Sequence, residues 1–127
     1  MKNIHLLLFT LVLPALAVNW AVLTAGSNNF YNYRHQSDVF HAYQVLIKRG
    51  FLPNNIIVLA YDDIARNTLN PFYGKIFNKP TYKDPGVDVY QGVPIDYTAA
   101  DVKPEVFLNV LLGNKSFVKG KGTGRVL

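Results

Sequence analysis

The sequence predicts an α/β fold in which a parallel sheet is flanked by helices. Three observations lead to this prediction. Two apolar segments, residues 19–27 and 56–61, have the pattern of strands buried on both faces, and the segment between them has helical periodicity. A strand, a helix and a second strand in this order almost always form a right-handed crossover with parallel strands. We therefore expect both strands to belong to one sheet.

Residues 1–17 are predicted to be removed rather than to join this fold. They contain Lys2, an uncharged apolar run at 6–13, and Ala-Leu-Ala at 15–17, the small-residue pattern that precedes a signal peptidase cleavage site. The apolar run is shorter than the roughly 20 residues of a membrane-spanning helix. We expect a signal peptide over residues 1–17, no stable membrane anchor, and a domain over residues 18–127.

The helix between the strands is predicted from one apolar stripe. Its apolar positions recur at the spacings i, i+3, i+4 and i+7 and are Val39, Ala42, Tyr43 and Leu46. Gly50 can adopt the left-handed conformation that ends a helix, and Pro53 prevents continuation. The carboxyl ends of the two strands, at residues 25–27 and 61–63, then meet at one edge of the sheet, where ligand sites form.

The second half of the chain is less regular. Residues 67–97 lack periodicity and contain several Pro and Gly turns, but their aromatic residues favour an ordered loop. A second helix is predicted from Pro104 to Gly113, and the basic segment 113–125 is expected to be a flexible, solvated tail. Two buried strands leave edges and a face uncovered, so we expect partner strands from a longer parent chain or from another chain.

Composition excludes several classes of protein. The 127 residues suffice for about one domain, and 13 Lys and Arg against 8 Asp and Glu give a net charge of +5. The charges are interspersed up to residue 101, which does not favour nucleic-acid binding. The sequence contains no cysteine, which excludes a disulfide scaffold and a thiol nucleophile within these residues.

Short polar motifs give few independent functional signals. On a helix, His35, Asp38 and His41 would spread over about 120° and rise by about 9 Å, so we expect no metal site there and no cofactor. Ser37 beside His35 and Asp38 resembles a triad only in composition. The Asp62-Asp63 pair could hold a cation or cap the next turn. A glycosylation acceptor motif begins at Asn114.

Longer motifs are more specific. FYNYRHQSDVFHAYQ at residues 30–44, YDDIARN at 61–67 and DVYQGVPIDYT at 88–98 occur in this order. Together they resemble the legumain family of asparaginyl endopeptidases, peptidase family C13, and the resemblance extends from about Asn19 to Leu127. The catalytic subunit of the glycosylphosphatidylinositol transamidase shares part of the pattern and is an alternative.

The resemblance implies a caspase-like sheet of which this chain supplies an incomplete N-terminal part. It implies a thiol protease that cleaves peptide bonds after Asn, in which Asn32 orients the catalytic His, and Arg34 and His35 form a wall of the pocket for the Asn side chain. The catalytic His and Cys of the family are expected after the segment ending at Leu127, so this chain should be inactive alone. From the residues alone, Asn32 could equally cap the helix and Arg34 could face solvent.

The resemblance also implies partners and a destination. Substrates would be peptides or proteins containing Asn, cystatin-type inhibitors would bind the enzyme, and the location would be the secretory pathway, with the lysosome, the vacuole or the cell exterior as its end. The rival class is a short secreted pseudo-enzyme that binds peptides or a protease partner without catalysis. The sequence leaves this alternative open.

Overall fold

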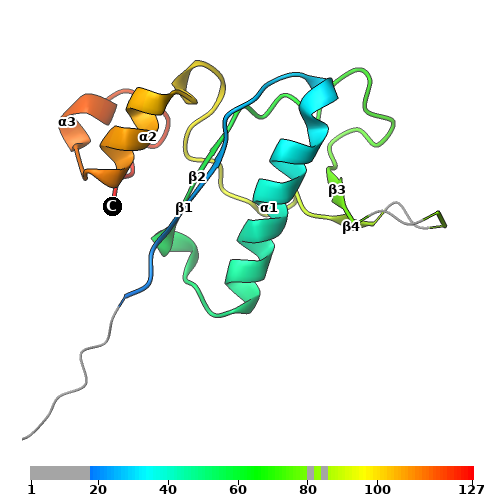
Figure 1. The fold of residues 1–127 in the computed structure, drawn as a ribbon, viewed down its shortest axis with the longest axis horizontal. Helices are drawn as coiled ribbons and strands as arrows, with labels where there is room; N and C mark the ends of the chain where they lie inside the picture. Colours follow the sequence, from blue (N-terminus) through cyan, green and yellow to red (C-terminus); the bar gives the residue numbers. More distant parts are fainter. Residues whose placement is uncertain (1–17, 80–81, 84–85) are drawn as a thin grey trace, which may run out of the picture.

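The computed structural model describes residues 18–79, 82–83 and 86–127, and the predicted signal peptide at 1–17 lies outside them. Two helices of at least two turns and two short sheets make up most of the regular structure of the described part (Figure 1). In chain order the strands and α-helices are β1 (Ala21–Ala25), α1 (Tyr33–Lys48), β2 (Ile56–Ala60), β3 (Phe77–Asn78), β4 (Val87–Asp88), α2 (Pro104–Leu111) and α3 (Lys115–Val118).

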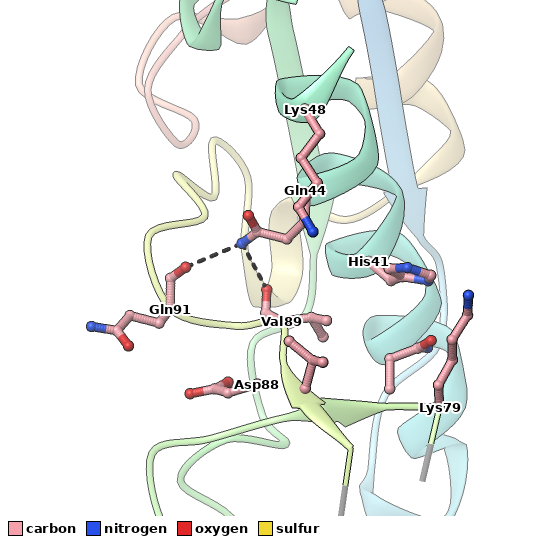
Figure 2. A pocket seen from close by; sticks show the side chains of 9 residues that line it. His41, Gln44, Lys48, Lys79, Asp88, Val89 and Gln91 are labelled. Carbon is pink, nitrogen blue, oxygen red and sulfur yellow. Dashed lines mark hydrogen bonds between the residues drawn. The ribbon is translucent and has the colours of Figure 1, made fainter. Parts of the chain in front are cut away.

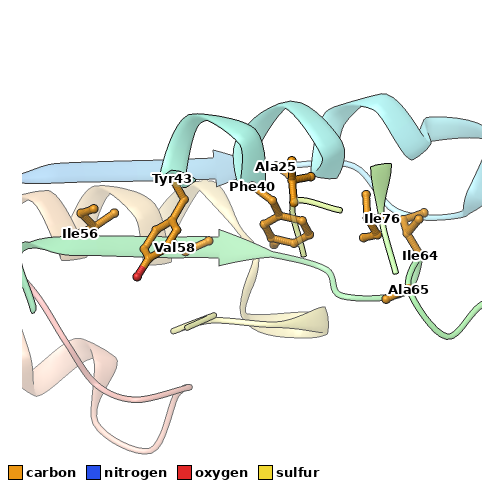
Figure 3. Packing of buried hydrophobic residues seen from close by; sticks show 10 residues of the cluster. Ala25, Phe40, Tyr43, Ile56, Val58, Ile64, Ala65 and Ile76 are labelled. Carbon is orange, nitrogen blue, oxygen red and sulfur yellow. The ribbon is translucent and has the colours of Figure 1, made fainter. Parts of the chain in front are cut away.

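The predicted strand, helix, strand unit is confirmed. β1 and β2 pair in parallel, with Ala21 opposite Ile56 and Ala25 opposite Ala60, and α1 lies along the sheet (Figure 1). Because side chains alternate along a strand, the two faces of β2 pack against different clusters of residues. Ile56, Val58 and Ala60 join the cluster that contains Phe40 and Tyr43 of α1 (Figure 3). Ile57 and Leu59 pack with Val106, Val110 and Val118 of α2 and α3.

The expectation that the two strands would lack cover is wrong for β2. All five of its residues have no exposed surface. Its edge away from β1 is bonded to the segment before α2, since the Asp96 N–H donates to the Val58 carbonyl (2.8 Å) and the Ala60 N–H donates to the Tyr97 carbonyl (3.0 Å). Within the described residues, the outer edge of β1 has no strand partner.

The expectation of a flexible tail at 113–125 is also wrong. This segment contains α3, and its end is held to the domain by a buried carboxylate. The Arg125 guanidinium lies 3.0 Å from Asp96, whose side chain also accepts bonds from Thr123 Oγ1 (2.8 Å) and the Val58 N–H (3.0 Å). Gly122 (φ +41°) lets the chain pass against the Asp96 carbonyl, where a Cβ would overlap.

In the described parts of the irregular segment before α2, side-chain bonds to the backbone hold the turn around Asn70. The buried Asn70 amide donates to the carbonyls of Ile64, Ala65 and Lys75. β3 and β4 form a short antiparallel pair beyond this turn. The predicted second helix is confirmed as α2, which begins at Pro104 and ends before Gly113.

Candidate functional site

The candidate site lies where β1 and β2 end side by side. The chain leaves β1 at Ala25, turns through residues 26–32 and enters α1, while β2 leads into residues 61–66. These two segments touch, because the Asn29 N–H donates to the Asp63 carboxylate at 2.6 Å. The carboxyl edge of the sheet therefore brings together the polar segments in which the sequence predicted a site.

His35 is fixed to the end of β1. Its Nδ1 lies 2.6 Å from Ser27 Oγ, and the residue is half-buried in the first turn of α1. This bond limits rotation of the imidazole and holds the start of α1 against the segment that leaves β1. The His35 ring is thus fixed at the end of β1, and Ser27 is a partner that sequence analysis did not identify.

Asn32 occupies the position before α1, but its side chain makes no hydrogen bond that caps the helix. Its Nδ2 instead donates to the Asn28 carbonyl at 2.9 Å. Within the described residues, Asn32 Oδ1 accepts no hydrogen bond and remains available to a donor from outside this segment. The helix-cap interpretation is therefore not realised in this geometry.

Arg34 is exposed and has no hydrogen bond or ion pair to any described residue. It follows Asn32 by two positions and directly precedes His35 in the first turn of α1. Its guanidinium offers planar donors that suit a carboxamide or carboxylate oxygen. The three predicted site residues thus lie together at one corner, and their donors and acceptors are only partly used.

Hydrogen bonds to the Asp63 carboxylate stabilise this corner. Asp63 accepts a bond from Gln36 Nε2 (2.7 Å) in addition to that from the Asn29 N–H, and Gln36 is 1% exposed. Its Oε1 is buried without a hydrogen-bond partner. Asp63 therefore links the end of β2 to α1 and to the turn before it. The sequence showed an acidic pair but not these partners, which lie 27 and 34 positions away.

The neighbouring Asp62 is occupied differently. It accepts a hydrogen bond from the Tyr90 hydroxyl (2.8 Å), and Arg66 donates to the same hydroxyl (3.3 Å). Burial and then the bond to Asp62 raise the pKa of Tyr90. Both carboxylates of the pair therefore bond to other segments rather than to the following turn. In the described part of the chain, no group of His, Asp and Glu side chains could hold a metal ion.

The glycosylation candidate lies away from this edge, before α3. The exposed Asn114 accepts bonds from the Phe117 N–H (3.2 Å) and from Ser116 Oγ (3.0 Å), and its Nδ2 donates to Asn109 Oδ1 (2.7 Å). Asn114 therefore caps α3, and its modification stays a prediction. None of the described helices is long and apolar enough to cross a membrane.

Fold and site define an α/β protein whose short, open parallel sheet carries a polar corner at its carboxyl edge, as in part of a caspase-like fold. The model of the Peptidase C13 family matches residues 19–127, and the chain belongs to this family of peptidases.

Three curated relatives illustrate the similarity. Legumain from Rattus norvegicus is 54% identical over 109 residues, which cover 86% of this chain and 24% of that protein. Legumain from Canavalia ensiformis is 58% identical over 108 residues, covering 85% and 22%. The vacuolar-processing enzyme delta-isozyme from Arabidopsis thaliana is 56% identical over 113 residues, covering 89% and 23%. The chain thus spans about a quarter of the length of these relatives.

Proposed function

We propose that this chain is the N-terminal part of a legumain-type cysteine endopeptidase that cleaves peptide bonds after Asn, and that it forms one edge of the substrate pocket. The observation that carries this proposal is the unpaired Arg34 guanidinium beside a His35 ring held by Ser27. The similarity to proteins named legumain supports a peptidase of this type.

The proposed chemistry divides between binding and orientation. Arg34 donates to the carboxamide oxygen of the substrate Asn, and His35 forms the adjoining wall. Asn32 Oδ1 accepts a hydrogen bond from an imidazole N–H and thereby holds a catalytic His in one orientation, as Asn does in papain-like sites. The sequence contains no cysteine, so the attacking thiolate would be supplied by a residue outside it.

A chimaera tests the substrate pocket. Residues 19–127 replace the matching segment of Rattus norvegicus legumain, and cleavage of Asn peptides is measured for the chimaera and for Arg34→Ala. Because the carboxamide oxygen loses its donor, kcat/KM should fall by about 1–3 kcal/mol in transition-state free energy, roughly 5- to 150-fold. The control is Arg49→Ala, an exposed arginine at the opposite end of α1. Unchanged kcat/KM in a folded Arg34→Ala chimaera would contradict the proposal.

The same chimaera separates the two interpretations of Asn32. If Asn32 orients an imidazole, Asn32→Ala lowers kcat and leaves KM nearly unchanged, and the loss of its exposed bond to the Asn28 carbonyl lowers the melting temperature only slightly. A helix cap would instead cost about 1 kcal/mol of stability and spare turnover. Since the side chain makes no cap bond, we expect the first result.

The cellular location of the protein and the presence of catalytic residues beyond Leu127 are tested separately. We propose entry into the secretory pathway, ending in a lysosome, a vacuole or the medium, with cleavage before Val18. N-terminal sequencing of the mature protein should begin there, and intact Met1 in a membrane fraction would contradict cleavage. If the coding region continues beyond Leu127, it should encode a strand that ends in His-Gly and, further on, a Cys. Finding both would support the endopeptidase over a non-catalytic pseudo-enzyme. Cystatin-type inhibitors stay predicted partners.

A further inference from the structure

A second concave region lies beside the later turns of α1, and its lining residues differ from those of the carboxyl-edge site. It is a cleft of about 360 Å³ between the later turns of α1 and the segment formed by β3, β4 and residues 89–91 (Figure 2). None of Asn32, Arg34 and His35 lines it. Its volume lies at the lower end of the range for small-molecule pockets.

Side-chain bonds tie the two walls of this cleft together. Gln44 of α1 donates to the carbonyls of Val89 (3.3 Å) and Gln91 (3.2 Å), as Figure 2 shows. Asn78 of β3 donates to Ser37 Oγ (2.9 Å) and to Asp38 (3.0 Å) on α1. Because both walls are bonded at separate points, the cleft is already formed without a ligand.

Three basic residues line the cleft. His41 and Lys48 lie two turns apart on α1, and Lys79 follows β3 on the facing wall (Figure 2). Neither lysine forms an ion pair with a described residue. Asp88 is the acidic lining residue among those described, and its Oδ1 accepts bonds from the N–H groups of Ile76 (3.3 Å) and Tyr90 (3.1 Å).

Two apolar residues also line the cleft. Val87 is 70% exposed and Val89 is buried. Two valines beside an imidazole and two ammonium groups that have no ion pair among the described residues match a ligand with a negatively charged head and a short hydrocarbon body. Charged hydrogen bonds to such a head are stronger than neutral ones, which favours an anion over a neutral ligand of the same shape.

We propose that this cleft binds a small organic anion, with its carboxylate or phosphate group against Lys48, Lys79 and His41 and its apolar body over Val87 and Val89. The site is separate from the proposed substrate pocket. Its occupation does not depend on whether the chain takes part in cleavage after Asn.

Amide NMR of this chain tests the proposal directly. The probes are succinate, inorganic phosphate and the neutral succinamide, each titrated to about 10 mM at constant ionic strength set with chloride. We expect saturable shifts at residues 41–48 and 87–91 with succinate, and none with succinamide. Tighter binding of succinate than of phosphate identifies an organic anion, whereas binding of phosphate alone assigns the site to a phosphate group.

Two pairs of substitutions show whether the lysines of the cleft are responsible. Lys48→Ala with Lys79→Ala should weaken succinate binding at least about tenfold, since two charged donors are lost. Lys103→Ala with Lys119→Ala removes the same charge from exposed residues outside the cleft and should leave the affinity unchanged. Absence of shifts at the cleft, shifts spread over Lys103, Lys115 and Lys119 outside it, or equal weakening in both variants would each overturn the proposal.

Discussion

Asn29 is the residue through which the stability of the candidate site can be tested most sharply. Its backbone has φ 67° and ψ 160°, a region occupied almost exclusively by glycine. Its N–H donates to Asp63 at 2.6 Å and its carbonyl accepts from the Asn32 N–H at 3.1 Å, so these two bonds hold the strained conformation. Such strain costs about 1–3 kcal/mol for a residue with a Cβ.

Replacing Asn29 by Gly should stabilise the chain. Both backbone bonds survive, the strain is relieved, and the lost side-chain contact to Asn32 Nδ2 is long at 3.5 Å. Subtracting about 0.5–1 kcal/mol for the greater freedom of glycine in the unfolded chain leaves a gain of about 1 kcal/mol. Denaturant unfolding should therefore show a higher midpoint with an unchanged slope.

The matched control is Asn29→Ala, which removes the same polar group but keeps the Cβ. We expect the order of stability to be Gly, then Asn, then Ala, because alanine retains the strain and loses the weak contact. A Gly variant that is less stable than the Ala variant would refute the argument. In that case the side chain of Asn29, and not its backbone, would govern the turn that leads to the site.

Three further predictions concern the rest of the fold. Asp96→Ala should destabilise the chain by about 2–4 kcal/mol in denaturant unfolding, because the buried Val58 N–H loses its side-chain acceptor and Arg125 loses its ion pair; a loss below about 1 kcal/mol would contradict this. Since folding raises the pKa of Tyr90 above about 10, the unfolded state loses its proton first as pH rises, and the free energy of unfolding should fall above pH 10. Tyr90→Phe should reduce that fall, and an unchanged pH profile would exclude the effect. In hydrogen exchange, amides of β2 should be more protected than those of β1, because β2 is fully buried and bonded at both edges; equal protection would show that the edge of β1 is covered.

The parts of the fold that the sequence predicted are those fixed by local patterns. β1, α1, β2 and α2 each have an apolar run or stripe bounded by Gly or Pro, so their residues carry the information for their own structure. The ion pair between Arg125 and Asp96 was not predicted from the sequence. The two residues lie 29 positions apart, and the segment that contains Arg125 has the composition of a solvated tail. An ion pair between residues far apart in the chain produces no periodic pattern in the sequence.

The residues of the candidate site likewise include some that the sequence predicted and some that it did not. Long motifs singled out Asn32, Arg34 and His35, and the structure places them at one corner of the sheet. The partners Ser27 and Asp63 were not predicted, because a serine after a strand and an acidic pair are common in turns of many kinds. Only the parallel register of β1 and β2, which sets their carboxyl ends level, brings these residues into contact.

The two edges of the sheet formed by β1 and β2 differ in a way that bears on the proposed function. β2 is bonded on its far side to residues 96–97, whereas the outer edge of β1 has no strand partner among the described residues. A further parallel strand could pair only there, and its carboxyl end would lie beside Ser27 and Asn32, at the corner that holds the unused Asn32 oxygen. The matched relatives are about four times as long as this chain, which leaves ample sequence for such a strand. Under the proposed function, an imidazole at the end of such a strand would be the group that donates to Asn32 Oδ1, and the edge of β1 would border the site.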